Sequence, residues 1–175
     1  MTFKIAGITQ NSIVDGPGMR LTIYTQGCNH HCKGCHNPET WDMNGGSYMD
    51  TDEVFDILVK DPLYDGITFS GGDPFEQSIP LAHLAKRIHN ETELNVIAFT
   101  GYTFESLVKN DTFMSLVKEC DYIIDGPFDK DKKSYDLLFR GSSNQRFIDV
   151  KKSLETSQVV SLSDDEINCL CSNIL

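Results

Sequence analysis

The stretch "MRLTIYTQGCNHHCKGC", residues 19–35, passes from a strand pattern directly into a group of cysteines. Residues 19–27 alternate and are rich in β-branched and aromatic side chains, which predicts a β-strand. The loop that follows carries Cys28, Cys32 and Cys35 with the spacing C-x3-C-x2-C. The three thiols are therefore expected to lie just beyond the C-terminal end of one strand.

Strand and helix patterns alternate along much of the chain that follows. Further strands are predicted at residues 66–74, 94–102 and 121–128, and helices at residues 50–60, 78–90 and 103–120, the last in two pieces. This alternation favours parallel βαβ connections and an α/β fold. Each predicted strand ends in a glycine-bearing turn, and in parallel α/β folds the site lies at those strand ends. The four turns, "QGC", "SGGDP", "TGY" and "DGPF", are therefore expected to converge.

The length of 175 residues favours a single domain over residues 1–175. Within it we expect a core at about residues 10–150 and a tail, residues 151–175, of unclear role. A closed eight-unit barrel usually takes about 250 residues, so an incomplete barrel or an open sheet is expected. No apolar run approaches the roughly 18 residues of a membrane span, and the N-terminus lacks a signal-peptide pattern. A cytoplasmic location is expected.

The net charge and the cysteine content indicate which classes of function the chain can have. Lysine and arginine number 15 against 26 aspartates and glutamates, so the net charge is −11, the wrong sign for binding nucleic acid. The 6 cysteines would suit disulfides in a secreted chain, but in a cytosolic chain their close spacing indicates metal or redox chemistry. Cys120 ends a helix pattern and is expected in the core, whereas Cys169 and Cys171 suggest no role.

The cysteine spacing by itself leaves three interpretations open. The thiols could be unligated. A structural zinc ion could bind them with His30, His31 or His36 as fourth ligand, although zinc ligands more often come as two pairs from separate segments. A 4Fe-4S cluster normally takes four thiolates, so three cysteines would leave one iron open to a small molecule.

Neighbouring motifs resemble a known family. "DGPGMR" (15–20), "YTQGCNHHCKGCHNPETWD" (24–42) and "FSGGDPF" (69–75) are similar to the glycyl-radical activating enzymes of the radical S-adenosylmethionine superfamily. "DGPF" (125–128) and "LLFRGSSNQRFIDV" (137–150) resemble the branch that activates the anaerobic ribonucleoside-triphosphate reductase. The resemblance implies the radical S-adenosylmethionine fold, an α/β fold built as an incomplete (βα)6-type parallel barrel.

The resemblance also implies the cofactors and the residues that bind them. A 4Fe-4S cluster would be held by Cys28, Cys32 and Cys35, with one open iron for S-adenosylmethionine. The expected contacts to S-adenosylmethionine are Gly71, Gly72 and Asp73 for the methionine amino group, and Gly34, Cys35 and His36 for the adenine. Many superfamily members carry an aromatic residue before the third cysteine where this chain has Gly34, which leaves the packing of the adenine unsettled.

The implied reaction is the reductive cleavage of S-adenosylmethionine to methionine and a 5′-deoxyadenosyl radical. That radical would take a hydrogen atom from a glycine of the large subunit of the reductase, with a low-potential donor such as flavodoxin supplying the electron. No catalytic side chain is expected, because the cluster and S-adenosylmethionine carry the chemistry. The alternatives are a pyruvate formate-lyase activating enzyme and a zinc-stabilised interaction module without enzymatic activity.

Two further segments have weaker functional interpretations. "DGPG" (15–18) is expected near the mouth of the site, where it would help to position Arg20 or a loop of the partner. Arg140, Asn144 and Gln145 are candidates for holding the backbone of a partner peptide, because their side chains offer many hydrogen-bond donors.

Overall fold

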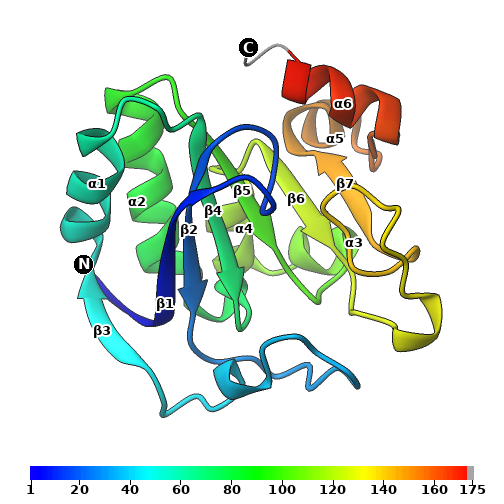
Figure 1. Ribbon diagram of the computed structural model, residues 1–175, viewed down its shortest axis with the longest axis horizontal. Helices are drawn as coiled ribbons and strands as arrows, with labels where there is room; N and C mark the ends of the chain where they lie inside the picture. Colours follow the sequence, from blue (N-terminus) through cyan, green and yellow to red (C-terminus); the bar gives the residue numbers. More distant parts are fainter. Residues whose placement is uncertain (173–175) are drawn as a thin grey trace.

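A seven-stranded sheet organises residues 1–172, the part of the chain described by the computed structural model (Figure 1). Its strands are β1 (Thr2–Ser12), β2 (Arg20–Thr25), β3 (Ser47–Asp50), β4 (Gly66–Gly71), β5 (Asn95–Phe99), β6 (Tyr122–Asp125) and β7 (Arg146–Asp149). Their order across the sheet is β3-β1-β2-β4-β5-β6-β7. The inner strands β2, β4, β5 and β6 are parallel, whereas β1, β3 and β7 pair antiparallel at the two sides.

The parallel core confirms the predicted α/β pattern, because the four strands expected from the sequence contain β2, β4, β5 and β6. The six-unit barrel is not confirmed. After β6 the chain returns to β7 through residues 126–145, which in this structure contain only the short 3₁₀ helix η3 (Lys130–Lys132). A parallel neighbour needs a long crossover, usually through an α-helix, so β7 instead pairs antiparallel.

Helices form in the three regions where the sequence predicts them, and two further helices form within residues 150–172. They are α1 (Thr51–Lys60), α2 (Ser78–Glu91), α3 (Phe104–Leu107), α4 (Asp111–Val117), α5 (Val150–Thr156) and α6 (Asp164–Ser172), with 3₁₀ helices η1 (Pro38–Thr40) and η2 (Pro74–Gln77). Asp50 and Glu53 form a capping box at the start of α1. Asn110 separates α3 from α4 because its side chain accepts hydrogen bonds from the first backbone amides of α4.

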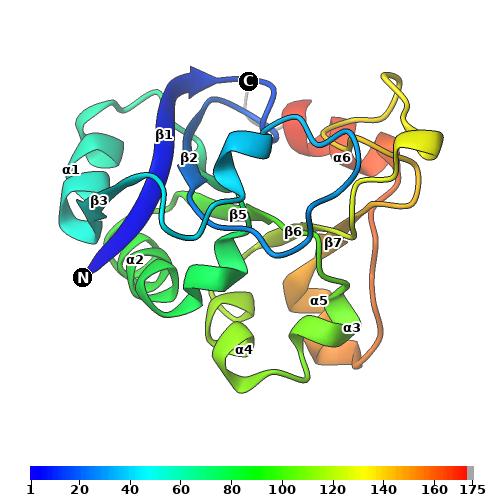
Figure 2. The same ribbon diagram turned by 90° about the horizontal axis from the view of Figure 1, so that it is seen from below.

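The two faces of the sheet are covered differently. Figure 2 shows α1, α2, α4 and α5 along one face, and α6 on the other face together with the loop that follows β2. Alternate residues of β5 serve the two layers: Val96 and Ala98 belong to the large core under the helices, whereas Ile97 belongs to a smaller core with Ile167 of α6. The C-terminal segment, whose role the sequence leaves unclear, therefore packs against the sheet through α6.

None of the helices within residues 1–172 has both the length and the apolar character that a bilayer crossing requires.

Candidate functional site

The loop that carries the cysteines begins directly after β2 and closes on itself. The backbone amide of Gly27 donates to the carbonyl of Thr40 at 2.8 Å, and that of Cys28 donates to the carbonyl of Trp41 at 3.2 Å. The side-chain amide of Gln26 donates to two further carbonyls of the same loop. Residues 26–42 therefore form one closed loop, with Cys28 at its base.

All three loop cysteines line one open cavity of about 800 Å³ at the C-terminal ends of the parallel strands. The other predicted turns contribute to the same cavity, through Gly71 and Gly72 after β4, Thr100 and Gly101 after β5, and Gly126 and Phe128 after β6. The predicted convergence of the four turns on one site is confirmed. A cavity of this size falls in the range of about 300–1,000 Å³ that small-molecule and cofactor sites occupy.

The surroundings of the loop cysteines act in opposite directions on thiolate formation. Burial raises the pKa of the Cys28 thiol to about 11, and hydrogen bonding from the backbone of His30 and His31 only partly opposes this effect. A thiol of this kind binds metal only after losing its proton, and bound cations favour that loss. The backbone amide of Asn37 donates to the Cys35 sulfur at 3.4 Å, the type of bond that stabilises a thiolate.

The described structure contains no preassembled set of ligands for a single metal ion. Within residues 1–172, no three side chains of His, Cys, Asp or Glu lie close enough together to hold one metal ion. A cluster separates its thiolates more widely than one ion does, because several iron and sulfide atoms lie between them. The three histidines of the loop also have other contacts: His30 bonds to Asp73, His31 lies edge-on to Trp41, and His36 lies against Phe128.

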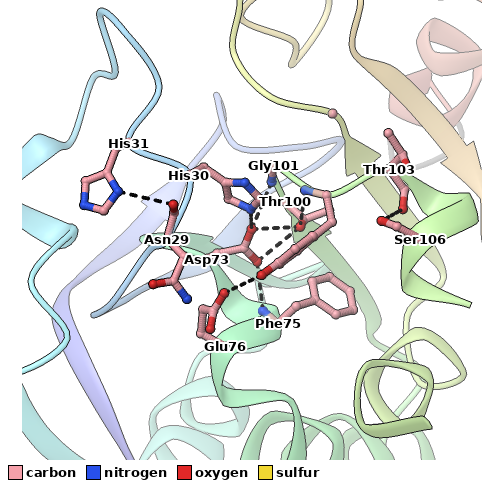
Figure 3. Close-up of polar contacts among 12 residues, drawn as sticks. Asn29, His30, His31, Asp73, Phe75, Glu76, Thr100, Gly101, Thr103 and Ser106 are labelled. Atoms are coloured by element: carbon pink, nitrogen blue, oxygen red, sulfur yellow. Dashed lines mark hydrogen bonds and ion pairs between the residues drawn. The ribbon is translucent and has the colours of Figure 1, made fainter. Parts of the chain in front are cut away.

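The carboxylate of Asp73, expected to contact S-adenosylmethionine, is fully buried in the described structure. Its two oxygens already accept hydrogen bonds from the backbone amides of Phe75 and Gly101, the hydroxyl of Thr100, and the ring of His30 (Figure 3). The side chain of Asp73 is not among the groups that line the cavity in the described structure. The sequence could not indicate this, since Thr100 and Gly101 come from a different strand.

The paired glycines lie against the protein's own backbone. A Cβ on Gly71, whose φ is +96°, would lie 2.6 Å from the backbone nitrogen of Thr25, and a Cβ on Gly72 would lie 2.3 Å from the carbonyl oxygen of Gly27. Both glycines nevertheless border the cavity. They allow the turn after β4 to pack closely against the start of the cysteine loop.

The residues expected near the adenine differ in their position relative to the cavity. Cys35 and His36 line the cavity, whereas Gly34 does not in the described structure. The aromatic ring of Phe128 lies 5.4 Å from that of His36, centroid to centroid, and Phe128 also lines the cavity. Sequence reasoning missed Phe128 as a site residue, although it ends the "DGPF" motif that was singled out.

The "DGPG" segment and Arg20, which it was expected to position, differ in their distance from the cavity. Asp15 lines the cavity, but Arg20 is fully buried at the first residues of the parallel strands and does not reach it. The guanidinium of Arg20 donates to Thr68 Oγ1 at 2.6 Å and to the carbonyl oxygens of Ile67 and Pro17 at 2.6 and 3.0 Å. Burial lowers its pKa to about 10 despite nearby carboxylates. Arg20 therefore supports the core and not the site.

The residues proposed to hold a partner peptide bond mainly to their own chain. Arg140 forms an ion pair with Asp164 of α6. The side-chain amide of Asn144 donates to the carbonyl of Pro127 at 2.8 Å, and the side chain of Gln145 accepts from the backbone of its own loop. Arg140 and Gln145 also border the cavity.

Comparison with known proteins adds a family and close relatives. A family model described as "4Fe-4S single cluster domain" matches residues 14–148. The anaerobic ribonucleoside-triphosphate reductase-activating protein of Salmonella typhi is 40% identical over 142 residues, which covers 76% of this chain and 90% of that protein. The proteins of that name from Escherichia coli (strain K12) and Enterobacteria phage T4 are 39% and 31% identical, over 90% and 85% of their lengths and 76% of this chain.

Among solved structures, a crystal structure of QueE from Escherichia coli aligns with a TM-score of 0.46 and 16% sequence identity. The alignment covers 59% of this chain and 54% of that chain, a likeness too weak to indicate function.

Proposed function

Since the chain belongs to the anaerobic ribonucleoside-triphosphate reductase-activating proteins and carries their 4Fe-4S single cluster domain, we propose that it activates that reductase as a radical S-adenosylmethionine enzyme. The observation that carries the proposal is the placement of three unpaired thiols on one cavity at the ends of four parallel strands. The curved sheet with its open cavity would serve as the incomplete barrel of this superfamily, and residues 1–175 would act as one domain.

Cys28, Cys32 and Cys35 would hold the 4Fe-4S cluster, and three thiolates would leave one iron open to S-adenosylmethionine. With the cluster and S-adenosylmethionine bound and one electron supplied by an external donor, the site would support reductive cleavage to methionine and a 5′-deoxyadenosyl radical, which would take a hydrogen atom from a glycine of the reductase. Backbone carbonyls of Gly71 and Gly72 are the acceptors proposed for the methionine amino group, because the Asp73 carboxylate is already saturated with hydrogen bonds.

The adenine is proposed to lie beside Cys35 and His36, with the backbone at Gly34 completing this side. The ring of Phe128 supports this placement, because it offers an apolar face beside His36 within the same cavity. Aromatic and apolar surfaces are the usual lining of small-molecule sites, with a few polar groups setting the orientation.

The partner is the large subunit of the anaerobic ribonucleoside-triphosphate reductase, and its glycine-bearing loop would enter through the open side of the cavity. Ile13, Val14 and Tyr135 border the cavity and are 69%, 72% and 88% exposed. Exposed apolar side chains at the mouth of a site suit contact with another protein. A low-potential donor such as flavodoxin would reduce the cluster. A cytoplasmic location is proposed because the six cysteines of the described structure are free thiols, and thiols stay reduced in the cytosol.

Anaerobic reconstitution with iron and sulfide tests this proposal. The expected product is a brown protein that cleaves S-adenosylmethionine in the presence of dithionite. Incubation with the large subunit of the anaerobic reductase should then give a glycyl radical detectable by electron paramagnetic resonance, and incubation with pyruvate formate-lyase is the matched control. A colourless protein that retains one zinc ion, or a radical formed only on pyruvate formate-lyase, would contradict the proposal.

A further inference from the structure

We propose that Asp73 is a positioning residue that acts through His30 to hold the cluster-binding loop, and that it is not a ligand of S-adenosylmethionine. The inference rests on the proposed function, because it takes the loop of Cys28, Cys32 and Cys35 as the cluster-binding loop. It adds two residues, one in the "SGGDP" turn and one between the first two cysteines, that would control the cluster without touching it.

The carboxylate of Asp73 joins three segments of the chain (Figure 3). Oδ2 accepts hydrogen bonds from the His30 ring at 2.8 Å, the Gly101 amide at 3.0 Å and the Thr100 hydroxyl at 2.9 Å. Oδ1 accepts from the Phe75 amide at 3.0 Å. A backbone amide can only donate, so the carboxylate acts as acceptor here and Nε2 of His30 is assigned the proton.

Asp73 forms hydrogen bonds with the cysteine loop on both sides of Cys28. Its backbone amide donates to the carbonyl of Gly27 at 2.8 Å, one residue before the cysteine. Its side chain bonds to His30, two residues after the cysteine. These two hydrogen bonds therefore fix the backbone on both sides of Cys28. Loss of the bond between Asp73 and His30 would free only the segment between Cys28 and Cys32.

Two further residues lie against the ring of His30, which also borders the cavity. It lies edge-on to Tyr102, with ring centroids 4.4 Å apart, and the Tyr102 hydroxyl donates to Glu76 at 2.6 Å. A Cβ on Gly101 would lie 2.5 Å from the His30 ring, so only glycine leaves room for the ring in this place. His30 is therefore held by the Asp73 carboxylate, the Tyr102 ring and the backbone at Gly101. These contacts suit it to fixing the conformation of the cysteine loop.

Residues behind metal ligands affect metal retention even without contacting the metal. Removal of such a partner typically lowers metal affinity or activity about 10- to 100-fold. We therefore expect Asp73→Asn and His30→Gln to release the reconstituted cluster about 10-fold faster than wild type and to change the paramagnetic spectrum of the reduced cluster. Because the two residues act as one unit, the double variant should be no worse than Asp73→Asn alone.

The test uses the full chain, reconstituted anaerobically, and measures iron retention after gel filtration, the spectrum and midpoint potential of the reduced cluster, and S-adenosylmethionine affinity per cluster. His31→Asn is the matched control, because His31 lies in the same loop, has a positive φ of 49° that asparagine tolerates, and does not contact Asp73. It should behave as wild type. S-adenosylmethionine affinity per remaining cluster should stay within about threefold in Asp73→Asn, because the Asp73 side chain does not line the cavity in the described structure.

Gly101→Ala is the second variant if Asp73→Asn does not fold, since it leaves the carboxylate in place and its Cβ would lie 2.5 Å from the His30 ring. It should reproduce the spectral change of His30→Gln. The inference is overturned if Asp73→Asn weakens S-adenosylmethionine binding with the cluster unchanged, or if His30→Gln and Gly101→Ala retain iron as wild type does. Wild-type protein that takes up no iron would contradict the proposed function itself, and the inference with it.

Discussion

Replacement of Ile167 by alanine tests whether the C-terminal helix α6 belongs to the folded core. Ile167 is fully buried, and it packs in the smaller core with Ile97, Ile124 and Phe147 from three strands of the sheet. Ile167→Ala removes three buried carbon atoms and leaves a cavity, a change that typically destabilises a protein by about 2–5 kcal/mol. Because the site is enclosed by strands that cannot easily collapse, we expect about 3 kcal/mol.

Urea denaturation of the full chain measures this loss, followed by circular dichroism and by the fluorescence of Trp41, the single tryptophan. With a urea dependence of about 2 kcal/mol per molar, the midpoint should fall by about 1.5 M. Asn168→Ala is the matched control, since Asn168 is the exposed next residue of the same helix and its loss should change stability by less than about 0.5 kcal/mol. Equal, small shifts for both variants would refute the packing described for α6.

Three further outcomes are expected. Cys32→Ser should lose most of the reconstituted iron, whereas Cys120→Ala, in the buried core away from the cavity, should retain it; iron analysis with equal losses would contradict the site. Glu105→Gln should reduce the loss of stability at low pH. Arg146 lowers the pKa of Glu105 to about 2 in the folded protein. The stabilisation by this ion pair is therefore present above the unfolded pKa of about 4.3 and is lost as pH falls toward 2. Since Glu105 is 53% exposed, solvent screening limits this effect to under about 1 kcal/mol, and pH-dependent unfolding curves that coincide for variant and wild type would exclude it. Arg20→Met should destabilise the protein by about 2–4 kcal/mol in thermal unfolding, because several buried acceptors lose their donor, and an unchanged melting temperature would contradict that role.

The parts of the fold that local patterns predict are those with strong, continuous signals. β2, β4, β5 and β6 are apolar runs that end in glycine turns, and each was predicted. The antiparallel strands were missed. β3 and β7 have four residues each, and their extended form depends on partners brought in by the rest of the sheet. β1 is long, but most of its side chains are partly or fully exposed, so it lacks the clear alternation of a half-buried strand.

The candidate site likewise contains residues that the sequence predicted and residues that it missed. The three cysteines and the two glycines of "SGGDP" were predicted, because their types and spacing mark the chemistry before any folding is known. Phe128 and the contacts of Asp73 were missed. A carboxylate after two glycines suggests a ligand contact in the sequence, but its actual partners Thr100 and Gly101 are 27 and 28 residues away.

The sequence by itself determined the thiol spacing, the parallel core and the meeting of strand ends at one cavity, since these follow from local residue patterns and from the geometry of parallel strands. Only the tertiary structure decided which polar groups remain free at that cavity. Whether a buried carboxylate faces a ligand or its own chain depends on donors that folding brings from distant segments, and an oxygen that already accepts two or three hydrogen bonds has little capacity for another.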